Sequence, residues 1–177
     1  TGAGGSIGSE LCLEILKLKP KIIVLFEICE FFLYELENLL SEKVAKYQND
    51  TKIISIIGDV RDEKKVDESL KFYRPHVIFH VAAYKHVPMS ERNPIETIMT
   101  NVKGTKNIAE LSIKYDVEKF VLVSTDKAVN PTNIMGTTKR IAEMICQYLE
   151  KKNQYKTKFS IVRFGNVLGS SGSVIPK

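Results

Sequence analysis

The sequence of 177 residues lacks the features of several protein classes. Its three cysteines, Cys12, Cys29 and Cys146, are far apart and form no Cys-x-x-Cys pair, so neither a disulfide framework nor a zinc site is expected. Buried thiols in a reducing cytoplasm are the simpler interpretation. No apolar run approaches the roughly 20 residues that a membrane helix needs, and the first residues do not have the pattern of a signal peptide. The sequence therefore predicts a soluble, cytoplasmic chain.

A concentrated run of basic residues is also missing. The 26 basic and 21 acidic residues give a net charge of +5, but the lysines are spread along the expected helices. Nucleic-acid binding is therefore not expected. No metal site is expected either. With 44% hydrophobic residues the chain can bury one core, and no internal repeat or low-complexity linker divides it. We expect a single domain over residues 1–177.

Hydrophobic periodicity predicts helices and strands in alternation. Strands are expected at 22–26, 52–57, 76–81, 119–123 and 158–162. Helices are expected at 6–18, 31–47, 63–73, 95–115 and 134–151. This order is typical of an α/β protein with a doubly wound parallel sheet, the Rossmann fold, in which ligands bind beyond the carboxyl ends of the strands. Functional residues should therefore follow the strands.

Each end of the chain differs from that of a whole Rossmann domain. A strand should lead into the glycine-rich turn at 1–8, and none precedes it here. Residues 175–177 follow a second glycine-rich stretch without a terminating helix or strand. We expect a fragment that lacks the first strand and the C-terminal substrate-binding part.

The first glycine-rich turn has a Gly-x-x-Gly-x-x-Gly spacing, a variant of the dinucleotide fingerprint. Such glycines let the backbone approach a pyrophosphate at the amino end of the next helix. Because glycine-rich turns before helices are common, the motif alone is weak. The candidate cofactor loop consists of Gly2, Gly5, Ser6, Ile7 and Gly8.

Polar or small residues follow the next strands. Glu27 lies about 20 residues after the glycines, where a carboxylate can accept from a ribose 2′-hydroxyl and repel a 2′-phosphate, which favours NAD over NADP. A solvated surface carboxylate is the alternative. Asp59, followed by Val60, can reach adenine or cap the next helix. After the fourth strand, the candidate ligand contacts are Ala82, Ala83, Lys85 and His86.

The richest segment follows the expected strand at 119–123. It contains Asp126 and Lys127, and the next helix carries Met135 and Lys139 four residues apart on one face. A lysine in that position can bind ribose hydroxyls. The alternatives are a core methionine, a solvated lysine and a solvated Asp–Lys pair in a surface loop.

Seven blocks in this order resemble one protein family. They are TGAGGSIGSEL at 1–11, GDVRD at 58–62, AAYKHVPM at 82–89, NVKGT at 101–105, VSTDKAVNPTN at 123–133, MGTTKR at 135–140 and VRFGNVLGSSGSVIP at 162–176. Together they resemble the extended short-chain dehydrogenase/reductase superfamily, and more closely the CapD-like polysaccharide-biosynthesis proteins, the membrane-associated UDP-N-acetylglucosamine 4,6-dehydratases.

The resemblance implies a reaction. NAD would take hydride from C4 of the UDP-sugar and return it to C6, while water leaves across C5 and C6 to give a UDP-4-keto-6-deoxy sugar. Met135 stands where the superfamily has the tyrosine of Tyr-x-x-x-Lys, and a thioether cannot serve as that base. The same departure is typical of the retaining branch of these dehydratases.

The resemblance also implies roles. Asp126 would be the acid at the C6 hydroxyl and Lys127 the base at C5, and both would need shifted pKa values. A dry site would keep the Asp126 carboxyl protonated, and desolvation or another cation such as Lys139 would make the Lys127 ammonium group neutral. Thr125 would bond the C4 oxygen, and Lys139 would hold the nicotinamide ribose. Water or Asp126 itself would take the C4 hydroxyl proton.

Two further contacts follow from the same family pattern. Asn101 would contact the cofactor, and Asn166 with the loop at 169–172 would reach the sugar or diphosphate. A turn-forming role beside Gly165 is the alternative for Asn166.

Two other functions remain open at this point: a UDP-sugar epimerase, and a non-catalytic dinucleotide-sensing module. Elimination requires the pair of Asp126 and Lys127, whereas simple epimerisation does not. The expected partners are a UDP-sugar and further copies of the chain in a homo-oligomer. Family members often carry amino-terminal membrane helices, which would tether the full-length protein to the cytoplasmic face of the membrane.

Overall fold

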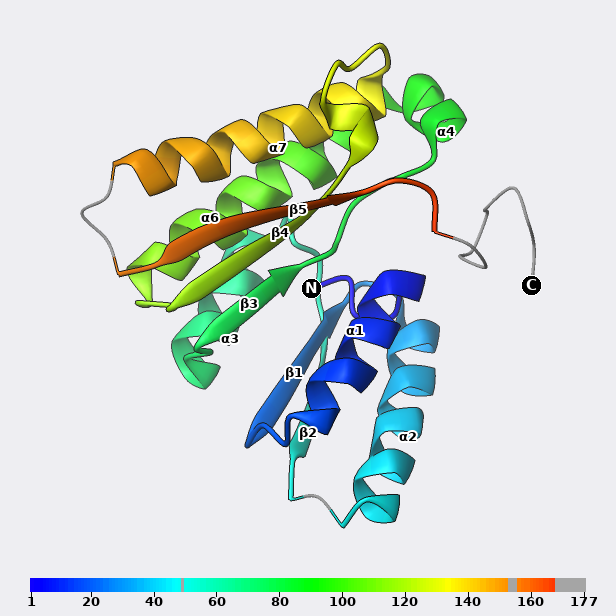
Figure 1. Cartoon of the computed structure of the whole chain (residues 1–177), viewed down its shortest axis with the longest axis vertical. Coiled ribbons are helices and arrows are strands. Elements are labelled where there is room, and N and C mark those ends of the chain that lie inside the picture. Colours follow the sequence, from blue (N-terminus) through cyan, green and yellow to red (C-terminus); the bar gives the residue numbers. More distant parts are fainter. Residues whose placement is uncertain (49, 153–155, 168–177) are drawn as a thin grey trace. The chain divides into compact units, whose positions relative to one another are not determined.

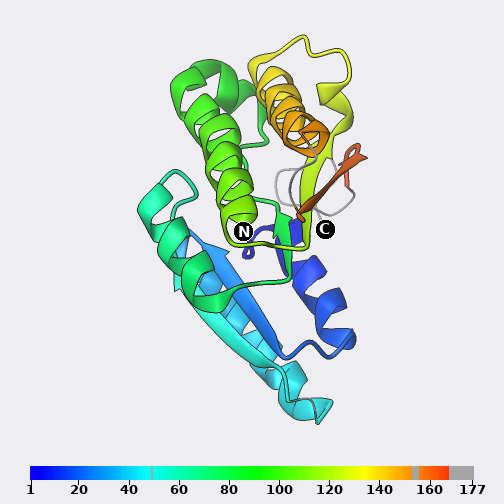
Figure 2. The same cartoon turned by 90° about the vertical axis from the view of Figure 1, so that its left-hand side faces the viewer.

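The computed structural model describes residues 1–48, 50–152 and 156–167 (Figure 1). The chain divides into two compact units, Thr1–Asp59 and Val60–Lys177, and each is described by itself. Figure 2 shows the elements of each unit from a second side. Within the described ranges, no helix is both long enough and apolar enough to cross a membrane.

The first unit contains two parallel strands. Its elements are α1 (Ser6–Lys17), β1 (Ile22–Glu27), α2 (Glu30–Lys46) and β2 (Lys52–Ile57). The register pairs Ile22 with Lys52 at one end and Glu27 with Ile57 at the other. Glu27 therefore lies at the carboxyl end of its strand, beside the equivalent end of β2.

Leucines at helical spacing hold this unit together. Leu33, Leu36 and Leu40 of α2 are buried in one cluster with Leu16 of α1 and Leu25 of β1. The spacing of three and four residues puts the α2 leucines on one face of the helix. This face packs against both strands and fixes the position of the loop that follows β1.

The second unit is built on three parallel strands in the order β3-β4-β5. Its elements are α3 (Glu63–Tyr73), β3 (Val77–His80), α4 (Val87–Arg92), α5 (Pro94–Ile98), the π-helix η1 (Met99–Gly104), α6 (Thr105–Lys114), β4 (Lys119–Thr125), the 3-10 turn η2 (Asp126–Ala128), α7 (Ile134–Lys151) and β5 (Lys158–Phe164). Helices α6 and α7 lie side by side, with α6 against β3 and α7 against β4 and β5 (Figures 1 and 2).

Helix α7 begins at a side-chain cap. The Asn133 side chain accepts a hydrogen bond from the Gly136 amide (2.8 Å), the usual role of an N-cap asparagine. From there the helix buries residues at intervals of three and four, among them Met135, Lys139 and Cys146. Two of the predicted site residues thus lie on the buried face.

One helix was expected over 95–115, and this prediction is wrong in its middle. The segment is helical, but α5 and α6 are separated by the π-helix Met99–Gly104, and the preceding helix α4 was not expected. Pro88 and Pro94 occupy first-turn positions, where proline favours the start of a helix, so two short helices form. The wider π turn accompanies the burial of Asn101, which is 1% exposed.

The remaining strands and helices agree with the prediction to within a few residues at their ends. Strands β4 and β5 extend further than expected, to Thr125 and Phe164, so Thr125 and Arg163 belong to strands rather than to loops. Parallel pairing of successive strands across intervening helices confirms the predicted α/β Rossmann-type fold.

Candidate active site

The glycine loop leads directly into the first turn of α1. Gly2 has a φ of 65°, which favours glycine, and its amide donates to the Phe26 carbonyl at 2.9 Å. A Cβ on Gly8 would lie 2.1 Å from the carbonyl oxygen of Gly2, so this close approach requires glycine. Gly5 stands at the N-cap and has no side chain with which to cap the first-turn amides. The loop fits a pyrophosphate, and its contacts through Gly2, Gly5, Ser6, Ile7 and Gly8 stay predictions.

Glu27 is 8% exposed at the end of β1, so the alternative of a solvated carboxylate is wrong. Its Oε1 accepts from the amides of Ile28 (2.9 Å) and Cys29 (3.0 Å), and its Oε2 accepts from the amide of Gly4 (3.0 Å). Glu27 therefore holds the glycine loop against the end of β1. A carboxylate oxygen can accept two bonds, so the predicted bond from a ribose hydroxyl is compatible with this arrangement.

Asp59 was expected to reach adenine or to cap the helix that follows. The cap of α3 is Asp62, whose Oδ1 accepts from the Lys65 amide at 3.0 Å, so the capping alternative for Asp59 is wrong. Val60 is buried, and its carbonyl accepts from Nδ2 of Asn107 at 3.1 Å. Cofactor contacts by Asp59 and Val60 stay predictions.

The loop after β3 is anchored by Asn101. The Asn101 Oδ1 accepts from the Tyr84 amide (2.8 Å), and its Nδ2 donates to the Tyr84 carbonyl and to Oγ1 of Thr138 (both 3.0 Å). These bonds fix the loop to α7. Because both hydrogens of the Asn101 side-chain amide are already donated, its predicted contact with the cofactor is limited to Oδ1. The other residues predicted for this loop are the half-buried Ala82 and Ala83 and the exposed Lys85 and His86.

Four predicted catalytic and substrate residues come together beyond β4 and β5. The Thr125 hydroxyl donates to Oδ1 of Asp126 at 2.8 Å. The Lys127 ammonium group donates to the same oxygen at 3.1 Å and to Oδ1 of Asn166 at 3.2 Å. The pair of Asp126 and Lys127 is therefore linked to both strand ends. The glycine-rich loop predicted at 169–172 lies outside the described residues.

The electrostatics of this pair differ from the expectation. The Asp126 side chain is 58% exposed, and its pKa is lowered, first by the hydrogen bond from Thr125 and then by the one from Lys127. The prediction that a dry site keeps this carboxyl protonated is wrong for this structure, because these bonds favour the ionised form. The Lys127 side chain is 36% exposed, so the expected desolvation of its ammonium group is also missing.

Lys139 is a desolvated lysine on α7. It is 7% exposed, and its Nζ donates to the Val123 carbonyl of β4 at 2.6 Å. Burial lowers its pKa to about 8, against an opposing attraction from Glu143. The alternative of a solvated Lys139 is therefore wrong. Met135, one turn earlier, is 3% exposed, which agrees with the alternative interpretation of this residue as a core methionine.

A family model described as "Polysaccharide biosynthesis protein" matches residues 1–177. The chain belongs to this family. Over 176 residues it is 49% identical to the "Capsular polysaccharide biosynthesis protein CapD" of Staphylococcus aureus, a match that covers 99% of this chain and 29% of that protein. The similar solved structure "Pen from Bacillus thuringiensis" has a TM-score of 0.85 and 37% identity, covering 98% of this chain and 51% of that one.

Relatives of this family member carry two kinds of enzyme name. The chain is 34% identical to a "UDP-N-acetylglucosamine 4,6-dehydratase (inverting)" of Campylobacter jejuni and 36% identical to a "UDP-glucose 4-epimerase" of Rickettsia rickettsii. Each match covers 99% of this chain and 50% of the relative. Identity alone thus does not separate elimination from epimerisation, and the chain spans half or less of these relatives.

Glu143, a fully buried carboxylate of α7, was not among the predicted site residues. It lies four residues after Lys139 and is bonded to Ser124, Arg140 and Arg163. An acidic residue at helical spacing from a buried lysine, on the apolar face of a helix, was the available signal. Without the fold, that pattern did not indicate that its partners come from β4 and β5.

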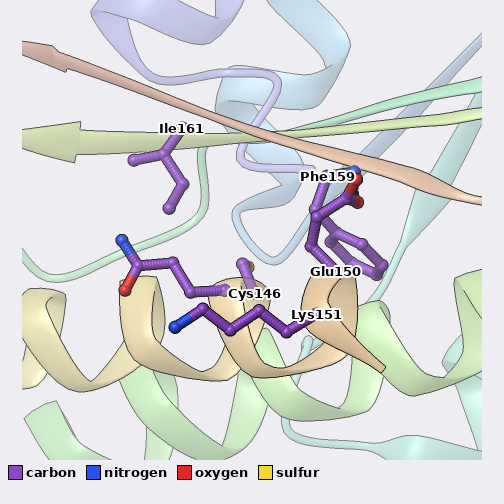
Figure 3. A pocket seen from close by; sticks show the side chains of 6 residues that line it. Cys146, Glu150, Lys151, Phe159 and Ile161 are labelled. Atoms are coloured by element: carbon purple, nitrogen blue, oxygen red, sulfur yellow. Dashed lines mark hydrogen bonds between the residues drawn. The ribbon is translucent and has the colours of Figure 1, made fainter. Parts of the chain in front are cut away.

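A hollow of about 350 Å³ lies between α7 and β5 (Figure 3). Its lining includes Cys146, Glu150 and Phe159 and contains none of the predicted site residues. Burial raises the pKa of Cys146 to about 12, which makes its thiol unreactive. Cys12 is buried as expected, whereas Cys29 is only half-buried.

Proposed function

We propose that the protein is a nucleotide-sugar 4,6-dehydratase of the retaining type. It converts UDP-N-acetylglucosamine to a UDP-4-keto-6-deoxy sugar for glycan biosynthesis, and residues 1–177 form its NAD-binding domain. The observation that carries this proposal is the bonded group of Thr125, Asp126 and Lys127. Elimination of water requires one acid and one base, and this group supplies both types within one turn.

NAD supplies the hydride acceptor and donor when bound. The glycine loop would hold the pyrophosphate at the start of α1, where the N-cap Gly5 has no side chain to occupy the first-turn amides. Glu27 would accept from the adenine ribose and repel a 2′-phosphate, which favours NAD over NADP. Lys139, buried beside β4, would bind the nicotinamide ribose.

The charges of the catalytic pair support a proton transfer on substrate binding. In the exposed state Asp126 is favoured as a carboxylate beside the Lys127 ammonium group. A bound sugar excludes water and penalises both charges, so the proton would move from Lys127 to Asp126 along their 3.1 Å hydrogen bond. This transfer produces a neutral acid and a neutral base without any net proton uptake.

Elimination would then return the pair to its starting charges. As C4 is oxidised, a water would take the C4 hydroxyl proton, because Asp126 is already protonated, and Thr125 would hold the C4 oxygen. The C5 proton beside the new ketone is then acidic. The Lys127 amine takes that proton, and the Asp126 carboxyl donates its own to the C6 hydroxyl, which leaves as water. The carbon–oxygen bond at C6 breaks, a C5–C6 double bond forms, and the ion pair is restored. Return of the hydride to C6, with a proton from Lys127 to C5, would then give the 4-keto-6-deoxy sugar.

A UDP-sugar epimerase on the same scaffold is the second candidate, and the Rickettsia relative favours it. Mass spectrometry of UDP-N-acetylglucosamine after incubation with the full-length protein separates the two. Dehydration removes one water from the sugar nucleotide, whereas epimerisation leaves its mass unchanged. An unchanged mass with a new chromatographic peak would replace our proposal by the epimerase. A substrate left entirely unaltered, with NAD bound, would favour the dinucleotide-sensing module.

We also propose that the protein forms a homo-oligomer. Ile141, Met144 and Tyr148 are exposed on α7, and their spacing puts these apolar side chains on one face of the helix. A second copy of the chain would bury this face. Sedimentation velocity of the full-length protein tests the proposal, and a monomer at micromolar concentration would contradict it.

A further inference from the structure

Glu143 is a buried charged group to which the proposed chemistry gives no role. Its side chain is 0% exposed on α7, and it is held by groups from three elements. Ser124 of β4 donates to Oε1 at 2.6 Å. Arg163 of β5 binds both oxygens, through Nε at 2.7 Å and Nη2 at 2.6 Å. Arg140 of α7 donates to Oε2 at 3.1 Å.

The partners of Glu143 stand next to the candidate catalytic residues. Ser124 directly precedes Thr125, and Arg163 lies three residues before Asn166. Lys139, one turn before Glu143, bonds the Val123 carbonyl, so two side chains of α7 bind two consecutive residues of β4. The carboxylate therefore joins the carboxyl ends of both strands to the helix that carries Lys139.

We infer that Glu143 is a positioning residue, which holds the ends of β4 and β5 on α7 and keeps the Lys139 ammonium group charged beside the cofactor. The inference rests on the proposed function, in which Lys139 binds the nicotinamide ribose. Arg163 binds the carboxylate with two parallel hydrogen bonds, a geometry that fixes direction as well as distance. A displaced carboxylate would move both Ser124 and Arg163, and with them Thr125 and Asn166.

The electrostatic surroundings support this role. Burial opposes the charge of Glu143, but hydrogen bonds from Arg163, Ser124 and Arg140 outweigh it and lower its pKa to about 2. Glu143, one turn after Lys139 on the same helix, attracts the proton of Lys139. His80 of β3 also interacts electrostatically with Lys139, and burial keeps it neutral by lowering its pKa well below the usual value.

The test uses the full-length protein with Glu143→Gln, Glu143→Asp and a control, Glu150→Gln. Glu150 also joins α7 to β5, through the Phe159 amide at 2.8 Å, but at the start of the strand. Affinity for NAD is measured from pH 6 to pH 10, and turnover is measured separately. Loss of the negative charge lowers the Lys139 pKa, so in Glu143→Gln the pH at which NAD affinity falls should decrease by roughly one unit.

Turnover should fall about tenfold or more in both Glu143 variants, because a displacement near 1 Å is enough for such a loss. The Asp variant keeps the negative charge, so the pH midpoint of its NAD affinity should stay at the wild-type value. A purely structural role of Glu143 would not make the midpoints of the Gln and Asp variants differ. Glu150→Gln should match wild type in both measurements. If Glu143→Gln does not fold, the Asp variant decides through its turnover.

The inference is overturned if Glu143→Gln has the wild-type pH midpoint, or if Glu143→Asp has wild-type turnover. The proposed dehydratase activity fails separately, when the wild-type protein forms no keto sugar. In that case the pH dependence of NAD affinity still tests Glu143, because that measurement does not depend on the reaction.

Discussion

The two lysines of the candidate site differ in burial, and the difference separates their roles. The Lys127 side chain is 36% exposed and bonded to an aspartate and an asparagine, whereas Lys139 is 7% exposed and bonded to a backbone carbonyl. An accessible amine can meet a substrate and exchange protons. A buried ammonium group is suited to holding a ligand in a fixed position.

Substitutions in the proposed catalytic pair should strongly slow dehydration. We expect Asp126→Asn or Lys127→Ala to lower turnover by roughly 100-fold or more, the range of general acid–base contributions, while NAD stays bound. The matched control is the ion pair of Asp67 and Lys114, which lies in the same unit at 2.5 Å. Asp67→Asn and Lys114→Ala should leave turnover unchanged. Near-normal turnover in either catalytic variant would remove the proposed mechanism.

Replacing Lys139 by methionine should stabilise the protein and weaken NAD binding. The pKa of Lys139 is lowered from 10.5 to about 8, so the unfolded chain binds more protons between these values. The cost of burying the ammonium group is complete below pH 8 and disappears as the pH rises towards 10.5. Lys139→Met should therefore raise the free energy of unfolding at pH 7 by about 2 kcal/mol.

Urea unfolding at pH 7 and pH 10 measures this effect, with Lys151→Met at the exposed end of α7 as the control. The gain should shrink at the higher pH. If the Lys139→Met protein is less stable than wild type at pH 7, burial of the Lys139 ammonium group in the wild-type protein does not oppose folding.

Glu27→Ala should reduce the preference for NAD over NADP about tenfold, because the repulsion of a 2′-phosphate is lost. The change also removes three hydrogen bonds to backbone amides, so Glu27→Gln serves to separate charge from loop geometry. Glu30→Ala, an exposed change on α2, is the control. Dissociation constants for both cofactors measure the effect, and an unchanged ratio would limit Glu27 to fixing the loop.

The sequence identified the residue types of the site but not their surroundings. Periodicity put Met135 and Lys139 on one helix face, and the bonded group after β4 contains the residues predicted for it. The burial of Glu27 and the low pKa of Asp126 were not predictable, since both depend on amides and hydroxyls whose directions are set by the fold.

At the scale of elements, periodicity located the strands well because each is a short, mostly apolar run that follows a helix. The single helix expected over 95–115 was the main error. A π-helix keeps nearly the same apolar spacing as an α-helix over one turn, so the pattern does not separate the two. Its cause lies in tertiary contacts, namely the bonds of Asn101 to Tyr84 and Thr138.

Helix α7 contacts the turn η2 at Gly136, where there is no room for a side chain. A Cβ on Gly136 would lie 2.4 Å from the carbonyl oxygen of Lys127, so Gly136→Ala must displace the turn that carries the catalytic pair. Alanine normally stabilises a helix interior by roughly 0.5–1 kcal/mol relative to glycine. We nevertheless expect turnover to fall at least tenfold, as measured in steady-state assays. Thr137→Ala, at the exposed next position, is the control, and wild-type turnover in Gly136→Ala would contradict the argument.

For the whole molecule, the order of strands and helices was enough to predict the α/β class, and the ordered blocks were enough to predict the family. The reaction depends on a few atoms within that common scaffold, which related enzymes use for different chemistry. Relatives named as dehydratases and as epimerases have nearly the same identity to this chain, so the assignment depends on chemistry at C5 and C6 of the sugar.

The most direct test follows UDP-N-acetylglucosamine with the full-length protein by proton NMR in deuterated water. We expect a C6 methyl signal beside a hydrated 4-ketone, with deuterium at C5, because the C5 proton is removed and replaced during each turnover. A new sugar epimer that keeps its C6 hydroxyl group and its C5 proton would rule out the dehydratase and assign the site to epimerisation.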